Sequence, residues 1–352
     1  MNVRRVALFA ALGLLAAVWA LAWLGSRLVE GAAGFVPIEP RNFETLTLVT
    51  AGTGGAWENP QRLGPVLAVG LGQRVALVDA GRGVAEALRA AEIPLAQPAT
   101  VYLTSLAPEN TVGLDDLLLT GWLAGRAQPL QVVGPPGTRA LVAGIQAAHR
   151  GADARAAELA LPEAGGRLEV EEVDCAMVGT RNGLTIHALT LSDGPSKRLA
   201  WRFDADGRAL VIAPFPGNEE ALANFANGAA LLVREAAYVP SPEEAQAAGI
   251  ETDPDRLRRE ARLHTPLESV ARLAQEAGVD TLVLVRLRPP PVYDFQVTNM
   301  IGDAFDGRIV IAEDGEQVTP EPRPLSTRVP EASAPGGGTT DRAAGRERAA
   351  LP

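Results

Sequence analysis

The order of strand-like and helix-like segments limits the fold more than any other feature of the chain. Short apolar runs predict strands, and amphipathic runs with helical periodicity lie between and after them, in two successive halves. This order favours two sheets packed face to face with helices on both outer surfaces. The sequence therefore predicts an α/β fold, a four-layer αββα sandwich. The expected strands are Leu46–Thr50, Pro65–Val69, Arg74–Val78, Leu130–Gly134, Leu168–Asp174, Leu184–Leu191, Leu199–Phe203, Ala209–Ile212, Ala229–Val233, Thr281–Val285 and Arg308–Ile311.

Composition narrows the classes of partner. The 352 residues are 47% hydrophobic, enough to bury one large core or two modest ones. The formal net charge of -10 argues against nucleic acid as a partner, because binding to a phosphate backbone relies on clustered Lys and Arg. The single cysteine, Cys175, cannot form an intrachain disulfide and is expected to fill space in a strand.

The N-terminus carries a membrane signal. Arg4 and Arg5 precede an uncharged apolar run from Val6 to Leu24, which as a helix would span about 28 Å, close to the hydrocarbon thickness of a bilayer. The run exceeds the apolar region of most signal peptides, although Ala20-Leu21-Ala22 could serve as a cleavage site. The positive-inside rule places the two arginines in the cytoplasm. We expect a single-pass protein of the bacterial inner membrane with a periplasmic domain.

These features divide the chain into four parts. Residues 1–28 are expected to form the N-terminal transmembrane helix or a signal sequence, and residues 29–45 a linker rich in Gly and Pro. Residues 46–316 form the expected globular domain. The remaining residues, 317–352, are rich in Pro, Gly, Ser and Thr and are expected to be a disordered tail.

A polar loop interrupts the first half of the domain. An apolar run beginning at Val101 reaches polar residues from Ser105 to Asn110, and Gly113-Leu114 then opens an apolar helix ending near Leu123. Earlier, Gly52-Thr53-Gly54 lies directly after the first strand. Glycine at such a position allows the backbone to pass close to another segment. Because no Lys-Ser or Lys-Thr pair follows, we interpret it as a tight turn rather than a phosphate loop.

Several segments, in order and at the right spacing, resemble the metallo-β-lactamase superfamily, and within it the ribonuclease Z and arylsulfatase-like branch. The resemblance covers roughly Leu46 to Ile311 and implies the αββα fold and a homodimer. The matching segments are Gly52-Thr-Gly54, Val78-Asp79-Ala-Gly81-Arg-Gly83, Leu103-Thr104, Gly113-Leu114, Gly134-Pro-Pro-Gly137, Trp201-Arg-Phe203, Asp206-Gly207-Arg208, Leu231-Leu-Val-Arg-Glu235-Ala, His264-Thr265 and Ala277-Gly278-Val279.

The departures from that family fall on its chemistry. In the family the polar loop reads His-x-His-x-Asp-His and supplies most ligands of a one- or two-metal centre. The residues that stand at ligand positions of the family here are Ser105, Ala107, Glu109, Asn110, Asp193, Phe215, Arg234 and Arg286. Zinc sites need three or four His, Cys or carboxylate ligands. Zinc is thus expected for the family but not for this chain, for which we predict no metal and no other cofactor.

Charge balance suggests what replaces the metal. Glu109, Asp193 and Asp79 are three oxygen donors that could weakly hold Mg²⁺ or Ca²⁺. The alternative is a salt-bridge core, because buried carboxylates need cationic partners. We predict that Arg286 pairs with at least one of these three. Arg234 is expected to pair with a carboxylate such as Glu235 or Asp193.

The three histidines have different interpretations. His149 ends a helix and His187 lies on a strand, so both are expected to be structural. His264 matches the family's non-ligand histidine, which resembles a proton donor to the leaving group, although a structural role at the start of a helix is the favoured interpretation. A Ser105, His264 and Asp193 triad is disfavoured, because no Gly-x-Ser-x-Gly motif surrounds any serine.

The sequence leaves two functions open. The leading hypothesis is a membrane-anchored pseudoenzyme that binds a protein or a small anionic ligand. The alternative is a hydrolase of the same fold, acting on a phosphodiester or on a sulfate or carboxyl ester through an atypical or metal-free site. The candidate pocket residues are Asp79, Glu109, Asp193, Arg234, His264 and Arg286.

Overall fold

The computed structural model describes residues 3–33, 38–56, 59–149, 151, 158–174, 176–181, 183–192, 197–247, 249, 253–288 and 294–322. Cys175 and Asp193 lie outside these residues, as does the expected tail beyond residue 322. The segment Asp206-Gly207, which joins β9 to β10, lies inside them. Both of its residues have positive φ, 50° and 71°, as a two-residue hairpin turn requires.

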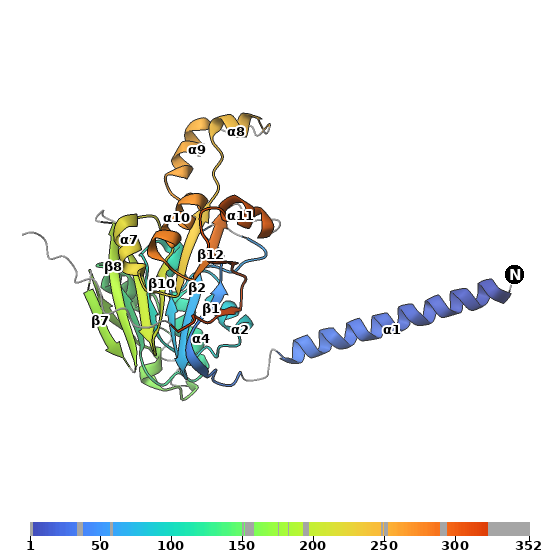
Figure 1. Cartoon of the computed structure of the whole chain (residues 1–352). Helices are drawn as coiled ribbons and strands as arrows, with labels where there is room; N and C mark the ends of the chain where they lie inside the picture. The colour runs from blue at the N-terminus through green and yellow to red at the C-terminus, as the bar shows by residue number, and fades with distance from the viewer. Residues whose placement is uncertain are drawn as a thin grey trace, which may run out of the picture.

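Two mixed seven-stranded sheets form the centre of the domain, and Figure 1 shows them. In each sheet one half is antiparallel and the other half is parallel. The first sheet has the order β14-β1-β2-β3-β4-β5-β6, with β1 at Phe43–Gly52, β2 at Val66–Gly72, β3 at Arg74–Val78, β4 at Pro98–Tyr102, β5 at Leu130–Gly134, β6 at Leu168–Glu172 and β14 at Glu316–Val318. The second has the order β13-β12-β11-β10-β9-β8-β7, with β7 at Ala176–Arg181, β8 at Leu184–Ser192, β9 at Arg198–Ala205, β10 at Arg208–Ala213, β11 at Leu231–Ala237, β12 at Thr281–Arg288 and β13 at Arg308–Ile311.

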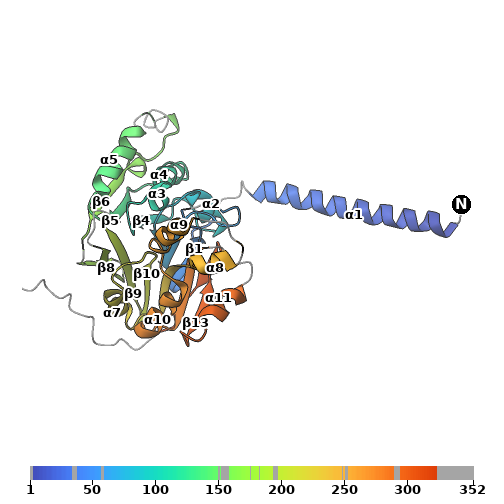
Figure 2. The ribbon, with the colours of Figure 1, turned by 90° about the horizontal axis from the view of Figure 1, so that it is seen from above.

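The helices lie outside the sheets, as Figure 2 shows from above. The helices on the first sheet are α2 (Val84–Ala90), α3 (Pro108–Thr111), α4 (Leu114–Leu123) and α5 (Thr138–Ala148), followed by a 3-10 turn at Glu163–Gly166. Those on the second are α7 (Glu219–Ala226), α10 (Leu267–Ala277) and α11 (Asp294–Ile301), while α8 (Pro242–Ala247) and α9 (Pro254–Ala261) stand apart from both sheets in Figure 1.

Three apolar cores separate the four layers. One lies between the first sheet and its helices, one between the second sheet and its helices, and the third between the two sheets. The third contains Tyr102 and Trp201, whose ring centroids are 4.9 Å apart. This arrangement confirms the predicted αββα sandwich, in which every sheet face is covered.

The edges of the domain differ from the sequence-based boundaries. The first strand begins at Phe43 rather than at Leu46, because the Phe43 ring packs against Gly70, where a side chain would lie 2.3 Å from the ring. At the other end, β14 pairs with β1 through Leu48 and Val318. Residues 317 and 318 therefore belong to the first sheet rather than to a disordered tail.

The N-terminal segment forms the helix α1 (Val3–Ala33), in which side chains are described only from residue 12 to residue 27. The large apolar side chains of this part are exposed, from Leu24 at 50% to Trp19 at 74%. Within the described residues, no helix combines the length and the apolar character that crossing a bilayer requires. The transmembrane helix expected from the sequence therefore finds no support there.

Candidate functional site

Asp79 follows β3 and takes a left-handed backbone conformation, with φ at 63°. Aspartate is among the non-glycine residues that adopt this region most readily. The turn places its buried carboxylate against the loop after β4, where Thr104 donates its amide at 2.8 Å and its hydroxyl at 2.7 Å. Burial raises the pKa of Asp79, and the Arg286 guanidinium and the Thr104 donors offset part of this rise.

Arg286 is the cation that meets this carboxylate. Its Nη2 donates to Asp79 Oδ2 at 2.7 Å, and the two side chains are only 4% and 1% exposed. The Arg286 backbone also has positive φ, 52°, and its amide donates to the Thr53 carbonyl at 2.7 Å. The guanidinium carbon lies 5.0 Å from the centroid of the Phe215 ring. The prediction that Arg286 pairs with one of the three carboxylates is confirmed, with Asp79 as the partner.

Arg234 has a different partner from those expected. Its fully buried guanidinium donates to both Glu219 oxygens, at 3.0 and 3.1 Å, and to the Phe215 carbonyl at 3.2 Å. Burial lowers the pKa of Arg234, and the Glu219 carboxylate opposes that shift. Glu235 could not take this place, because successive side chains of a strand point to opposite faces. The other expected partner, Asp193, lies outside the described residues.

The loop after β4 is held by its own side chains. The Asn110 amide group donates to Ser105 Oγ at 2.8 Å and to Thr104 Oγ1 at 3.1 Å. Ser105 Oγ also accepts from the Ala107 amide at 3.1 Å. Ser105 and Asn110 are buried, whereas Glu109 is half-buried and faces a cavity. The resemblance assigns four positions of this loop to metal ligands. Three of them, Ser105, Ala107 and Asn110, instead form hydrogen bonds within the loop.

Two contacts from the second sheet fix the base of this loop. Trp201 donates its indole N–H to the Leu103 carbonyl at 3.1 Å, and the Leu199 amide donates to the Thr104 carbonyl at 2.7 Å. Both donors belong to β9. They hold Arg198, the first residue of β9, beside the polar loop, although no local sequence pattern indicated this.

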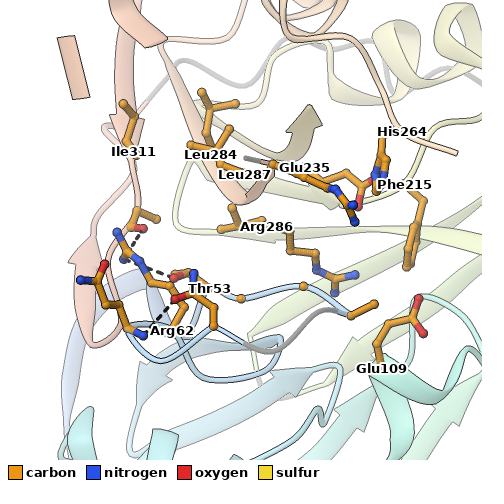
Figure 3. Close-up of a pocket in the computed structure, with 18 of the residues that line it drawn as sticks. Thr53, Arg62, Glu109, Phe215, Glu235, His264, Leu284, Arg286, Leu287 and Ile311 are labelled. Atoms are coloured by element: carbon orange, nitrogen blue, oxygen red, sulfur yellow. Dashed lines mark hydrogen bonds and ion pairs between the residues drawn. The ribbon is translucent and has the colours of Figure 1, made fainter. Parts of the chain in front are cut away.

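A cavity of about 750 Å³ opens at this edge of the two sheets, and Figure 3 shows it. Of the predicted site residues, Glu109, Phe215, His264 and Arg286 line it. The remaining described ones, Asp79, Ser105, Ala107, Asn110 and Arg234, are not among its lining residues.

Glu235 and His264 form one side of the cavity. His264 precedes α10, and the Thr265 carbonyl accepts from the Ala237 amide at 2.9 Å, which keeps this segment beside β11. His264 Nδ1 lies 3.6 Å from Glu235 Oε1, beyond hydrogen-bonding distance. Glu235 is 5% exposed. Sequence reasoning considered Glu235 only as a partner of Arg234, although strand alternation places it on the opposite face.

Arg198 is a second residue that sequence reasoning missed. Its guanidinium carbon lies 5.5 Å from the centroid of the Phe215 ring, and its Nη1 donates to the Pro216 carbonyl at 3.1 Å. Phe215 therefore contacts two arginine side chains, since Arg286 meets the same ring. An aromatic face attracts a cation through its quadrupole. The only sequence signal was a pair of cations, Lys197 and Arg198, directly before an apolar strand.

The described residues do not fit a zinc centre. Among them, no group of three or more His, Cys, Asp or Glu side chains converges as metal ligands would. The Arg286 guanidinium, paired with Asp79, occupies a position that the resemblance assigns to a ligand, and a fixed cation there opposes the binding of a second one. Asp193 is outside the described residues, so the prediction of no cofactor stays a prediction.

Comparisons with known proteins place these features in context. The chain is 30% identical over 281 residues to a protein from Mycobacterium sp. (strain KMS) named ribonuclease Z, an alignment that covers 77% of this chain and 95% of that protein. It is 29% identical over 284 residues to a ribonuclease Z from Mycobacterium marinum, covering 78% of this chain and 98% of that protein. No protein-family profile matches the chain.

Solved structures show the same fold. The metallo-β-lactamase-fold protein YhfI from Bacillus subtilis superposes with a TM-score of 0.60 at 17% identity, covering 78% of this chain and 98% of that one. Human tRNase Z, short form, has a TM-score of 0.58 at 17% identity, with 78% and 99% covered.

Proposed function

Since this chain belongs to the ribonuclease Z-like family of metallo-β-lactamase-fold proteins, we propose that the cavity beside Phe215 is its functional site. There it binds an anionic ligand through arginine side chains rather than through a metal centre. The observation that carries this proposal is the pair of guanidinium groups, from Arg198 and Arg286, on the Phe215 ring at the cavity wall. Guanidinium groups suit carboxylate and phosphate ligands because they present planar sets of N–H donors.

The charge at the wall supports this proposal. Four arginines line the cavity, namely Arg62, Arg198, Arg286 and Arg288, against the two carboxylates Glu109 and Glu235. Arg286 is paired with the buried carboxylate of Asp79, and Arg62 lies 3.6 Å from the exposed carboxylate of Glu313. An excess of cations in a partly enclosed site concentrates anions there.

Titration of the full-length protein with inorganic phosphate, followed by calorimetry, tests this function. We expect saturable binding that weakens about tenfold or more in Arg198→Gln, because a charge-assisted contact is lost. Arg258→Gln is the matched control, since Arg258 lies on α9, is exposed and is paired with Asp255. Absence of binding to the parent protein, or equal weakening in both variants, would contradict the proposal.

Hydrolysis in the same cavity is the second candidate, and the names of the relatives support it better than a binding-only pseudoenzyme. His264 and Glu235 lie 3.6 Å apart beside the arginines, so an imidazole could donate a proton to a leaving group while guanidinium groups stabilise the developing negative charge. Release of nitrophenol from bis(p-nitrophenyl) phosphate by the parent protein, lost in His264→Ala, would establish this activity. If the parent protein binds phosphate but releases no nitrophenol, hydrolysis is contradicted and only the binding function is supported.

We further propose that α1 attaches the domain to the bacterial inner membrane, with the domain in the periplasm. The exposed apolar side chains from Leu12 to Leu24 and the preceding Arg4 and Arg5 support this location. A reporter fused after residue 320 should be active only outside the cytoplasm. Cytoplasmic activity would overturn the proposed orientation. A homodimer, a protein partner and the lack of a nucleic-acid partner stay predictions.

A further inference from the structure

Glu235 lines the cavity, and one oxygen of its carboxylate is buried there without a hydrogen-bond donor among the described residues. The residue is 5% exposed, and its Oε1 has no hydrogen-bond partner within the described residues. Leaving such an oxygen unsatisfied is destabilising, and a native structure rarely retains one without a reason. A donor brought by a ligand would satisfy it.

Glu109 adds a second carboxylate to the same cavity. It is half-buried, it lines the cavity, and its carboxylate has no hydrogen bond or ion pair with the residues that the structure describes. In Figure 3 the Arg286 side chain lies between Glu235 on one side and Glu109 on the other. Two carboxylates in one cavity repel each other, so their presence favours a ligand with a positively charged group that offsets this repulsion.

The arginine side chains of the cavity, in contrast, need a negatively charged partner. Arg286 donates one nitrogen, Nη2, to Asp79, and Arg198 donates Nη1 to the Pro216 carbonyl. A guanidinium has five N–H donors, so each side chain retains donors for an anion after these contacts. The cavity thus combines guanidinium donors with two nearby carboxylates: Glu109, and Glu235, whose Oε1 lies 3.6 Å from His264 Nδ1 without a hydrogen-bond donor among the described residues.

We infer that the ligand is a small zwitterion, with a phosphate or carboxylate group against Arg198 and Arg286 and a protonated amine against Glu235 and Glu109. This inference rests on the anion site proposed above and adds the amine to it. The volume of about 750 Å³ lies in the range of small-molecule sites, roughly 300 to 1,000 Å³. His264, 3.6 Å from Glu235, is placed to meet the same end of the ligand.

Calorimetry of the full-length protein with three probes tests the inference without any mutation. Inorganic phosphate offers the anion, ethanolamine offers the amine, and phosphoethanolamine offers both. We expect phosphoethanolamine to bind about tenfold tighter than phosphate or more, the equivalent of one additional charged contact. Ethanolamine alone should bind more weakly than either.

The variant Glu235→Gln tests whether Glu235 is the residue that makes phosphoethanolamine bind more tightly than phosphate. It keeps the shape of the side chain and removes the charge, so the advantage of phosphoethanolamine should disappear while phosphate affinity is retained. Glu243→Gln, on the exposed face of α8, is the control and should retain the advantage. Phosphoethanolamine binding no tighter than phosphate, or a preference that survives Glu235→Gln, would overturn the zwitterion but not the anion site. Failure of all three probes to bind would overturn the proposed function itself.

Discussion

An ion pair between two buried side chains, Arg286 and Asp79, fixes the position of a cation at the wall of the cavity. Arg286 and Asp79 both depart from ordinary backbone geometry, with φ at 52° and 63°. Asp79 directly follows β3 of the first sheet, and Arg286 lies in β12 of the second, two residues before its end. The Thr53 carbonyl holds the Arg286 backbone, and the Thr104 donors hold the Asp79 carboxylate, where the pair can form. Because several contacts fix both members, the ion pair is an integral part of the fold, and it links the first sheet to the second.

Removing one member of this pair should be costly. Arg286→Ala leaves the Asp79 carboxylate buried and unpaired, so we expect a loss of about 3 to 5 kcal/mol in the free energy of unfolding, measured by urea denaturation. Arg258→Ala, at an exposed site, should change it by less than about 0.5 kcal/mol. The double variant Arg286→Met with Asp79→Asn should recover part of the loss, because no charge is then buried. An Arg286→Ala protein as stable as the parent would show that Asp79 does not depend on this cation.

At the scale of an element, the turn after β1 forms one wall of the cavity. It can do so because Gly52 has no side chain, which allows its backbone to approach that of Gly64 closely. A Cβ on Gly52 would lie 2.1 Å from the Gly64 carbonyl oxygen. The adjacent residues Thr53 to Ala56 line the cavity, so the close approach of the two segments sets its shape.

Substitution at this turn should therefore destabilise the domain. For Gly52→Ala we expect a loss of about 1 to 3 kcal/mol, since the backbone must move to relieve the overlap. Gly144→Ala is the matched control. Gly144 lies in the exposed part of α5 with open space around it, and alanine there should stabilise the protein by up to about 1 kcal/mol. Thermal denaturation of both variants measures the difference, and equal melting temperatures would contradict this account of the turn.

The elements were predictable from sequence because strand and helix patterns are local. The sandwich, the turn at Gly52 and the need of Arg286 for a carboxylate all follow from local patterns or from charge balance. The partner of Arg234 was not predictable, because Glu219 arrives from a separate helix. The sequence of a strand does not show which of its residues will face a cavity that other segments help to form. For this reason Arg198 and Glu235 were not predicted as lining residues.

At the scale of the whole molecule, the chain keeps the fold of its family and changes the charges at one edge of it. Three apolar cores hold the four layers together and do not depend on the cavity. The edge where the two sheets meet the polar loop can therefore carry Arg286, Ser105 and Phe215, where the resemblance implies metal ligands, while the layers stay packed. This separation between core and site explains how the fold can persist when the side chains at that edge change.

The metal content of the purified full-length protein, measured by plasma mass spectrometry after dialysis without chelator, tests the central claim most directly. The claim is that arginine pairing has replaced the metal centre. It predicts that zinc, manganese and iron together remain well below one equivalent per chain. One equivalent or more of any of these metals surviving dialysis would contradict it.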